Sequence, residues 1–205
     1  MSEFIHRYVP PRGESRRTLL LLHGTGGDEN DLLPLGAELD PEAGLLSLRG
    51  KVSERGAPRF FRRLAEGVFD QEDLRLRTDE LGEFLREASV RYGFDPAGLI
   101  AVGYSNGANI AASLLFRHPD ALAAAALLHA MVPFVPETTP DLAGKRIFLG
   151  AGENDPIVAP EETTRLHGLF HRAGAEVQTA WFPYGHSLSG PEVRAAGMWL
   201  ESIGV

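Results

Sequence analysis

The amino-acid sequence predicts a three-layer α/β domain, with a mostly parallel central sheet flanked by helices. Six short apolar runs show no alternation of apolar and polar residues, which is typical of strands buried on both faces of a parallel sheet. Segments with helical spacing of apolar residues separate these runs. Strands and helices that alternate in this way indicate an α/β architecture. Because the chain has 205 residues and no linker-like segment, we expect a single domain over residues 1–205.

The predicted strands span residues 18–22, 45–48, 99–104, 123–128, 146–150 and 177–182. The predicted helices span residues 73–92, 106–117, 160–173 and 191–203. The first helix places Leu74, Leu81 and Leu85 on one stripe that can face a sheet. Pro160 and Pro191 suit the first turn of the last two helices, where a missing N–H costs nothing.

Residues 50–69 do not fit the alternation, because Gly, Pro, Arg and Phe are mixed there without a clean period. We expect an irregular excursion at the end of the second strand. Ligands of open α/β sheets bind beyond the carboxyl ends of the strands, so this excursion should lie beside any active site.

Composition excludes several classes of function. Twenty basic and 28 acidic residues give a net charge of −8, which disfavours binding to nucleic acid. The basic run at 59–63 has acidic neighbours at Glu54, Glu66 and Asp70, which favours local salt bridges. The absence of cysteine excludes disulfides and a thiolate nucleophile. We find no signal-peptide pattern and no membrane-spanning apolar stretch, so we expect a cytoplasmic protein without membrane contact.

The most specific motif is the G-x-S-x-G run at 103–107, centred on Ser105, which lies between a predicted strand and a predicted helix. Such a serine occupies a tight, strained turn that lifts its Oγ clear of the sheet, and the glycines remove side chains that would clash there. The alternative is a glycine-rich turn with a buried serine. The strand and helix on either side favour a nucleophile.

A serine nucleophile needs a base and an acid that orients the base. His186 lies in a turn just after the last predicted strand, whereas His167 and His171 lie on a helix before it. Asp155 follows the strand at 146–150 and lies between Ser105 and His186, in the order that such hydrolases use. We therefore predict Ser105, Asp155 and His186 as the catalytic triad. Glu153 remains an alternative acid, and either acid could instead cap the following helix.

Acyl transfer also needs N–H donors aimed at the developing oxyanion. The glycine-rich segment 23–27 follows the first predicted strand, so we assign the two donors to the backbone N–H groups of Thr25 and Asn106. This loop could instead hold a phosphate, but it lacks both the G-x-G-x-x-G pattern and the P-loop lysine. His167 and His171 have the i, i+4 spacing of zinc ligands, but no glutamate follows the first histidine, and we predict no metal.

An apolar pocket for the acyl or alcohol group is expected next to this machinery. The candidates lie in the 50–69 excursion and beyond the strand at 123–128: Phe60, Phe61, Leu64, Phe69, Met131 and Val132. Each of them could equally be core, because composition does not separate the two roles.

Four segments together resemble the small carboxylesterase and phospholipase family of α/β-hydrolases, which includes acyl-protein thioesterases. They are LHGTGGDE at 22–29, GYSNGAN at 103–109, GENDPIV at 152–158 and GHSL at 185–188. With RFFRR at 59–63, they most resemble a bacterial branch described as hydroquinone-specific or phospholipase/carboxylesterase proteins. The resemblance implies an α/β-hydrolase fold without a large cap domain. It also implies cofactor-free hydrolysis of a small-molecule ester through an acyl-serine intermediate, and often a homodimer.

The chain departs from the family pattern at one position and differs from a related group at another. Many family members have glutamine after the nucleophile, where this chain has Asn106. Dienelactone hydrolases share the fold but use cysteine, so Ser105 distinguishes this chain from them. The alternatives to a carboxylesterase are a thioesterase or lysophospholipase with the same machinery, a peptidase, which the lack of an inserted cap disfavours, and a non-catalytic receptor for a small ligand.

Overall fold

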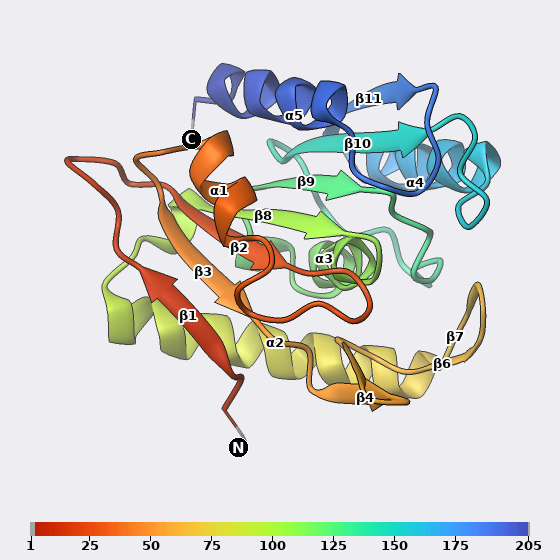
Figure 1. Ribbon diagram of the computed structural model, residues 1–205, viewed down its shortest axis with the longest axis horizontal. Helices are drawn as coiled ribbons and strands as arrows, with labels where there is room; N and C mark the ends of the chain where they lie inside the picture. Colours follow the sequence, from red (N-terminus) through yellow and green to blue (C-terminus); the bar gives the residue numbers. More distant parts are fainter. Residues whose placement is uncertain (1–2, 205) are drawn as a thin grey trace.

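The computed structural model describes residues 3–204 and has a seven-stranded sheet at its centre (Figure 1). In order across the sheet, the strands are β1 (His6–Val9), β3 (Gly44–Leu48), β2 (Thr18–Leu22), β8 (Leu99–Tyr104), β9 (Ala124–Leu128), β10 (Arg146–Gly152) and β11 (Glu176–Phe182). β1 pairs antiparallel with β3, and all other neighbours are parallel. The predicted mostly parallel sheet is confirmed.

Helices cover both faces of this sheet (Figure 1). The helices α2 (Gln71–Tyr92), α3 (Asn106–Arg117) and α4 (Pro160–Arg172) contribute to one buried apolar cluster. The helices α1 (Leu33–Leu39) and α5 (Gly190–Ser202) contribute to the second, on the opposite face. Short 3₁₀ turns, Pro96–Gly98 and Pro119–Ala121, precede β8 and β9. The result is the three-layer arrangement, without a large cap, that the sequence predicts.

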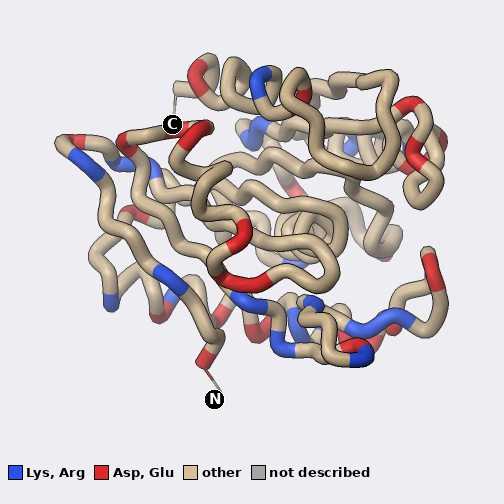
Figure 2. The backbone as a smooth tube through the Cα atoms, viewed as in Figure 1, with Lys and Arg blue, Asp and Glu red and all other residues tan. Residues whose placement is uncertain are grey.

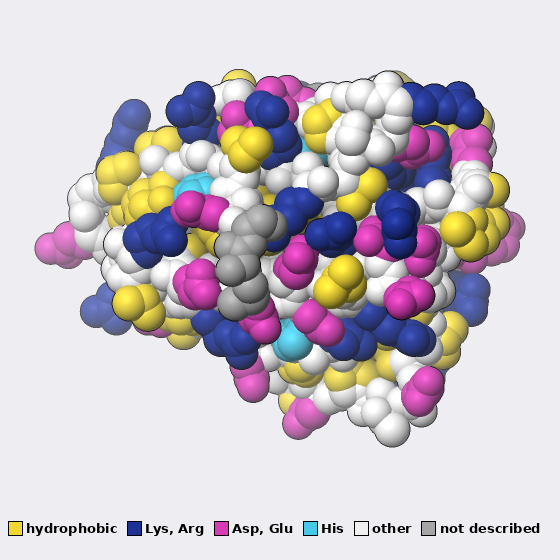
Figure 3. Space-filling model, turned by 90° about the horizontal axis from the view of Figure 1, so that it is seen from below, with side chains coloured by type: hydrophobic (Ala, Val, Ile, Leu, Met, Phe, Trp, Pro, Cys, Tyr) yellow, Lys and Arg dark blue, Asp and Glu magenta, His cyan; other side chains and the backbone are white. Residues whose placement is uncertain are grey.

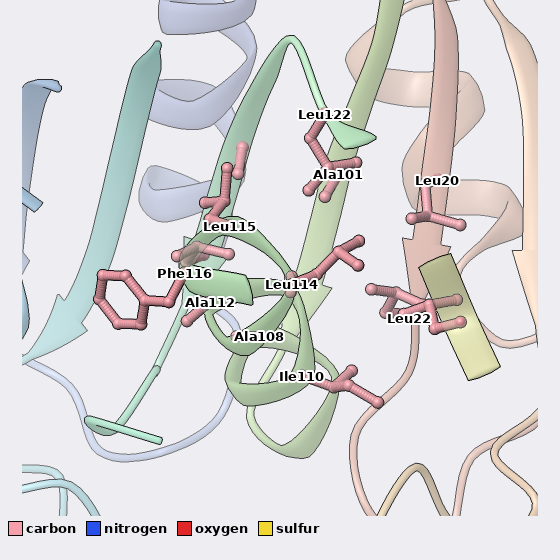
Figure 4. Close-up of a cluster of buried hydrophobic side chains, with 14 of the residues drawn as sticks. Leu20, Leu22, Ala101, Ala108, Ile110, Ala112, Leu114, Leu115, Phe116 and Leu122 are labelled. Atoms are coloured by element: carbon pink, nitrogen blue, oxygen red, sulfur yellow. The ribbon is translucent and has the colours of Figure 1, made fainter. Parts of the chain in front are cut away.

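The helix α3 lies deepest in the molecule, and its side chains are buried from Asn106 to Phe116. Figure 4 shows Ile110 and Leu114 of α3 on the side of Leu22 of β2, and Leu115 and Phe116 on the opposite side of the helix. This burial fixes the N-terminus of α3, and therefore Ser105, relative to the sheet.

The excursion at 50–69 is more regular than expected, because it folds into two small hairpins. β4 (Val52–Glu54) pairs with β5 (Ala57–Arg59), and β6 (Arg63–Ala65) pairs with β7 (Val68–Phe69). Both lie beyond the end of β3, near the start of α2 (Figure 1).

The three arginines of the basic run at 59–63 are paired with acidic residues, as the sequence predicts. Arg59 and Arg63 both contact Glu54, at 3.3 and 3.1 Å, and Arg62 contacts Asp70 at 3.2 Å. Charged positions lie mostly outside the central strands (Figure 2), and on the face shown in Figure 3 basic side chains lie among acidic ones. No helix among residues 3–204 has the length and hydropathy needed to cross a bilayer.

Candidate active site

Ser105 lies at a sharp turn between β8 and α3. Its backbone has φ 52° and ψ −113°. Residues other than glycine rarely adopt a positive φ of this kind. Its N–H donates to the carbonyl of Leu128 at 2.8 Å, which holds the turn against β9. The strained turn that the motif predicts is therefore present.

The two glycines of the motif are required by close backbone packing. A Cβ atom on Gly107 would lie 2.0 Å from the carbonyl oxygen of Leu22, and one on Gly103 would lie 2.7 Å from the backbone of Ala108. Neither contact involves a side chain that could move away. The chain can make this turn against β2 only with glycine at both positions.

The structure brings Ser105, His186 and Asp155 together at the carboxyl end of the sheet. Ser105 Oγ lies 2.9 Å from His186 Nε2, and His186 Nδ1 lies 2.7 Å from Asp155 Oδ2. His186 follows β11, and its backbone carbonyl accepts a hydrogen bond from the hydroxyl of Tyr104 at 2.8 Å. Glu153, the alternative acid, is exposed and has no side-chain bond to His186. The arrangement suits proton transfer from serine to histidine.

The loop after β10 holds the Asp155 carboxylate in its ionised form. Oδ1 accepts hydrogen bonds from the N–H groups of Ile157 and Val158, at 2.8 and 3.0 Å. Oδ2 is bonded to the rings of His186 and His129. Burial on its own raises the pKa of Asp155, but the two N–H groups and the two rings outweigh it and leave the pKa below its usual value.

The two candidate oxyanion donors flank Ser105. Asn106 is the first residue of α3, so its N–H has no acceptor within the helix. Among residues 3–204, no hydrogen bond is recorded for the N–H of Thr25. Both residues line the same cavity as Ser105 and His186. This placement is compatible with the two donors that we predict.

Four hydrogen bonds attach the excursion to this machinery. Arg59 Nη1 donates to Thr25 Oγ1 at 2.7 Å, and the next N–H along that loop, of Gly26, donates to the carbonyl of Pro58 at 2.9 Å. The N–H of Phe60 donates to Asn106 Oδ1 at 2.7 Å. The N–H of Gly50, at the start of the excursion, donates to His23 Nε2 at 3.0 Å. The position of the loop that carries Thr25 therefore depends on the excursion.

A cavity of about 360 Å³ opens above Ser105. Of the six predicted pocket residues, Phe69 and Met131 line it. Arg59, Arg63 and Glu66 also line it, so its wall is more polar than we expected.

The other four predicted pocket residues lie elsewhere. Phe60 and Phe61 have exposed fractions of 1% and 0%, because Phe60 packs on the His23 ring and Phe61 packs edge-on against Phe69. Val132 is buried in the core cluster. Leu64 is 73% exposed on the β6–β7 hairpin, outside the cavity.

The structure adds two residues that the sequence analysis did not select. His129, directly after β9, has its Nδ1 2.8 Å from Asp155 Oδ2 and its Nε2 3.2 Å from Glu192 Oε2. Both side chains are almost fully buried, with exposed fractions of 2% and 1%. The sequence signal that could have identified His129 is its position at the carboxyl end of a predicted parallel strand. This signal was missed because the histidine lies within an apolar run.

The three side chains of His129, Asp155 and His186 bring candidate metal-ligand atoms within 4.8 Å of one another. Hydrogen bonds already join these atoms. His167 and His171, the pair that we considered for zinc, make other contacts. His167 Nδ1 lies 2.9 Å from Thr179 Oγ1, and the His167 ring stacks on the His171 ring.

Comparisons with known proteins show which family the chain resembles. The model of the dienelactone hydrolase family matches residues 55–196. The Bacillus subtilis (strain 168) protein named "Putative hydrolase MhqD" is 49% identical over 195 residues, which are 95% of this chain and 98% of that protein. A crystal structure of the Bacillus cereus carboxylesterase is 52% identical, with a TM-score of 0.93, covering 95% of this chain and 92% of that one. A carboxylesterase from Mesorhizobium loti is 36% identical, with a TM-score of 0.88 over 93% and 90% of the two chains.

Proposed function

The chain belongs to the dienelactone hydrolase family, and from this premise we propose that it is a serine-dependent carboxylesterase that hydrolyses small carboxylic esters. The observation that carries the proposal is the continuous chain of hydrogen bonds from Ser105 Oγ through His186 to Asp155, with distances of 2.9 and 2.7 Å. Its carboxylesterase neighbours support the same activity. Because the chain has no cysteine, family membership does not bring a cysteine nucleophile with it.

In the proposed mechanism, Ser105 Oγ attacks the ester carbonyl while its proton passes to His186 Nε2. The tetrahedral intermediate collapses, and the alcohol leaves with the proton from His186. Water then attacks the acyl-serine ester, giving its proton to His186, and the acid is released as Ser105 regains a proton. Asp155 orients the ring and stabilises its positive charge in both halves of the reaction.

The negative charge on the carbonyl oxygen is held by the backbone N–H groups of Thr25 and Asn106. These donors are fixed before the substrate arrives. Asn106 is held by the start of α3, and Thr25 is held by the bond from Arg59 to its hydroxyl and by the bond from the neighbouring Gly26 N–H to Pro58. Fixed donors need no reorganisation in the transition state, which makes this kind of stabilisation effective.

The cavity supports a small ester with a partly polar body. Phe69 and Met131 offer an apolar wall, and Arg59, Arg63 and Glu66 offer charged groups. A volume of about 360 Å³ lies at the lower end of the range for small-molecule sites. We therefore expect short acyl chains to be preferred.

The decisive experiment is the intact mass after incubation with a fluorophosphonate, measured on the wild type and on Ser105→Ala. We expect a single adduct on the wild type and none on the variant. The absence of an adduct on the wild type would refute the proposal and favour a receptor, and an adduct on Ser105→Ala would mean that another serine is the nucleophile.

A panel of p-nitrophenyl esters and matched thioesters tests the substrate class. We expect kcat/KM to fall as the acyl chain outgrows the cavity. Flat activity from short to long chains would contradict a limit set by the cavity volume, and a preference for thioesters would identify a thioesterase. Activity should survive exhaustive chelation, since we propose no metal and no cofactor. The single domain, cytoplasmic location and homodimer stay predictions.

A further inference from the structure

A buried histidine lies directly behind the proposed triad. His129 has φ 55°, a left-handed conformation that is uncommon for residues other than glycine. Its two ring nitrogens face two carboxylates, Asp155 at 2.8 Å and Glu192 at 3.2 Å. A buried histidine between two buried acids has no role in the mechanism described above. Its position indicates a further role at the same site.

Each ring nitrogen of His129 is placed to donate a hydrogen bond to a carboxylate. Ionised carboxylates only accept hydrogen bonds, so a ring nitrogen that faces each of them must carry a proton. Glu192 lies in the first turn of α5, where the helix dipole favours a negative charge, and its Oε2 also accepts from the N–H of Ser189 at 3.4 Å. Asp155 accepts four hydrogen bonds. With both acids ionised, each ring nitrogen donates to a carboxylate and His129 carries two protons.

We propose that His129 and Glu192 form a positioning pair, in which His129 is an imidazolium that shares Asp155 Oδ2 with His186 and keeps His186 unprotonated to lower pH. This inference rests on the proposed function, in which His186 acts as the base. His129 acts through Asp155 and contacts no reacting atom.

The groups around His129 support this distribution of charge. The ring of His186 lies 5.1 Å away and that of Tyr104 5.9 Å away, centroid to centroid. Burial raises the pKa of Tyr104, so this hydroxyl stays neutral. Burial on its own lowers the pKa of His129, but Glu192 and Asp155 outweigh it and leave the pKa raised. One cation between two anions lies within reach of the catalytic base.

The consequence is a shift in the pH–rate profile. A positive charge beside His186 disfavours its protonation, and protonated His186 cannot act as a base. Removing that charge makes His186 take up a proton at higher pH. The acidic limb of kcat/KM should therefore move upward by about one pH unit, the lower end of the effect of a charge within 4–6 Å.

The test variant is His129→Asn. Asparagine tolerates the left-handed backbone, and its side-chain amide keeps an N–H donor toward Asp155 while losing the charge. We expect the limb to rise by about one unit, so that kcat/KM on the limb falls about tenfold, while the high-pH plateau changes less. The control is His171→Asn, an exposed histidine on α4, which should leave the profile unchanged. An unshifted limb in His129→Asn would overturn the proposal.

A direct measurement does not depend on that variant folding. In histidine-labelled wild type at about pH 8, nitrogen NMR should show one histidine with both ring nitrogens protonated, whereas an ordinary histidine is neutral there. Glu192→Gln should move its deprotonation to lower pH, which also assigns the signal to His129. A wild type with no doubly protonated histidine at that pH would refute the proposal.

Fluorophosphonate labelling separates this inference from the function on which it rests. An adduct on Ser105 with an unshifted limb refutes the role of His129 alone. The absence of any adduct refutes the proposed function, while the NMR result still decides the protonation of His129.

Discussion

Replacing Ser105 with glycine should give a more stable protein than replacing it with alanine. Both variants lose the hydroxyl and its bond to His186, and both should be inactive as esterases. They differ in the Cβ atom, which alanine keeps in the left-handed backbone at φ 52° and glycine removes. Their difference in stability therefore isolates the strain in the turn.

The magnitude follows from two opposing terms. A residue held in such a region stores about 1–3 kcal/mol of strain, which glycine releases. Glycine also gives the unfolded chain more conformational freedom, which costs about 0.5–1 kcal/mol relative to alanine. The free energy of unfolding of Ser105→Gly should therefore exceed that of Ser105→Ala by about 1 kcal/mol, or roughly 2–4 °C in Tm for a chain of this size.

Urea unfolding followed by tryptophan fluorescence measures this difference, provided that both variants give the same slope. A matched control is Ser89, which lies in α2 on an ordinary helical backbone. There glycine should be less stable than alanine by about 0.8–1 kcal/mol. At each position, the measured quantity is the free energy of unfolding of the glycine variant minus that of the alanine variant. If this difference at Ser105 equals the difference at Ser89, the turn stores no strain and the reasoning is refuted.

Three further outcomes follow from the geometry. Gly107→Ala should lose about 3 kcal/mol or more in urea unfolding, because its Cβ would lie 2.0 Å from a backbone oxygen of β2, whereas Gly190→Ala meets only an arginine side chain at 3.3 Å and should cost little. Arg59→Met should lower kcat by about a hundredfold with a smaller change in KM, because the variant loses the bond that holds the Thr25 loop. An unchanged kcat would show that the loop keeps its position without Arg59. Burial lowers the pKa of His23, so the unfolded chain binds a proton that the folded chain excludes. The stability that His23 contributes should be present above about pH 6.5 and lost as the pH falls, and His23→Gln should unfold with a weaker acid dependence; identical pH dependence in the two proteins would contradict this.

The central strands were predictable because each is a short apolar run that is buried on both faces, as in β2, β8 and β9. β1 was not predicted, because its four residues HRYV alternate between less and more exposed at an antiparallel edge and give too short a pattern. The seven-residue helix α1 is likewise too short for a periodic signal.

The proposed triad could be predicted because local turns and chain order place its members. The pocket could not, because core and pocket use the same apolar residues. Phe61 and Phe69 pack against each other, yet only Phe69 lines the cavity. That difference depends on how the hairpins fold back over the sheet. His129 was missed because its partner Glu192 comes from α5, 63 residues away, a proximity that no local pattern encodes.

The two halves of the excursion at 50–69 differ in how tightly they are bonded to the proposed catalytic groups, and therefore in how much their sequences can change. The first half, through Phe60, is bonded to His23, Thr25, Gly26 and Asn106. An insertion in this half would displace the groups proposed to stabilise the oxyanion. Changes of substrate specificity are therefore not expected to be accepted there without loss of activity. The β6–β7 hairpin forms part of the cavity rim without such bonds. New specificities within this lineage would arise by changing the length and composition of that hairpin, while the hydrolytic apparatus is inherited intact.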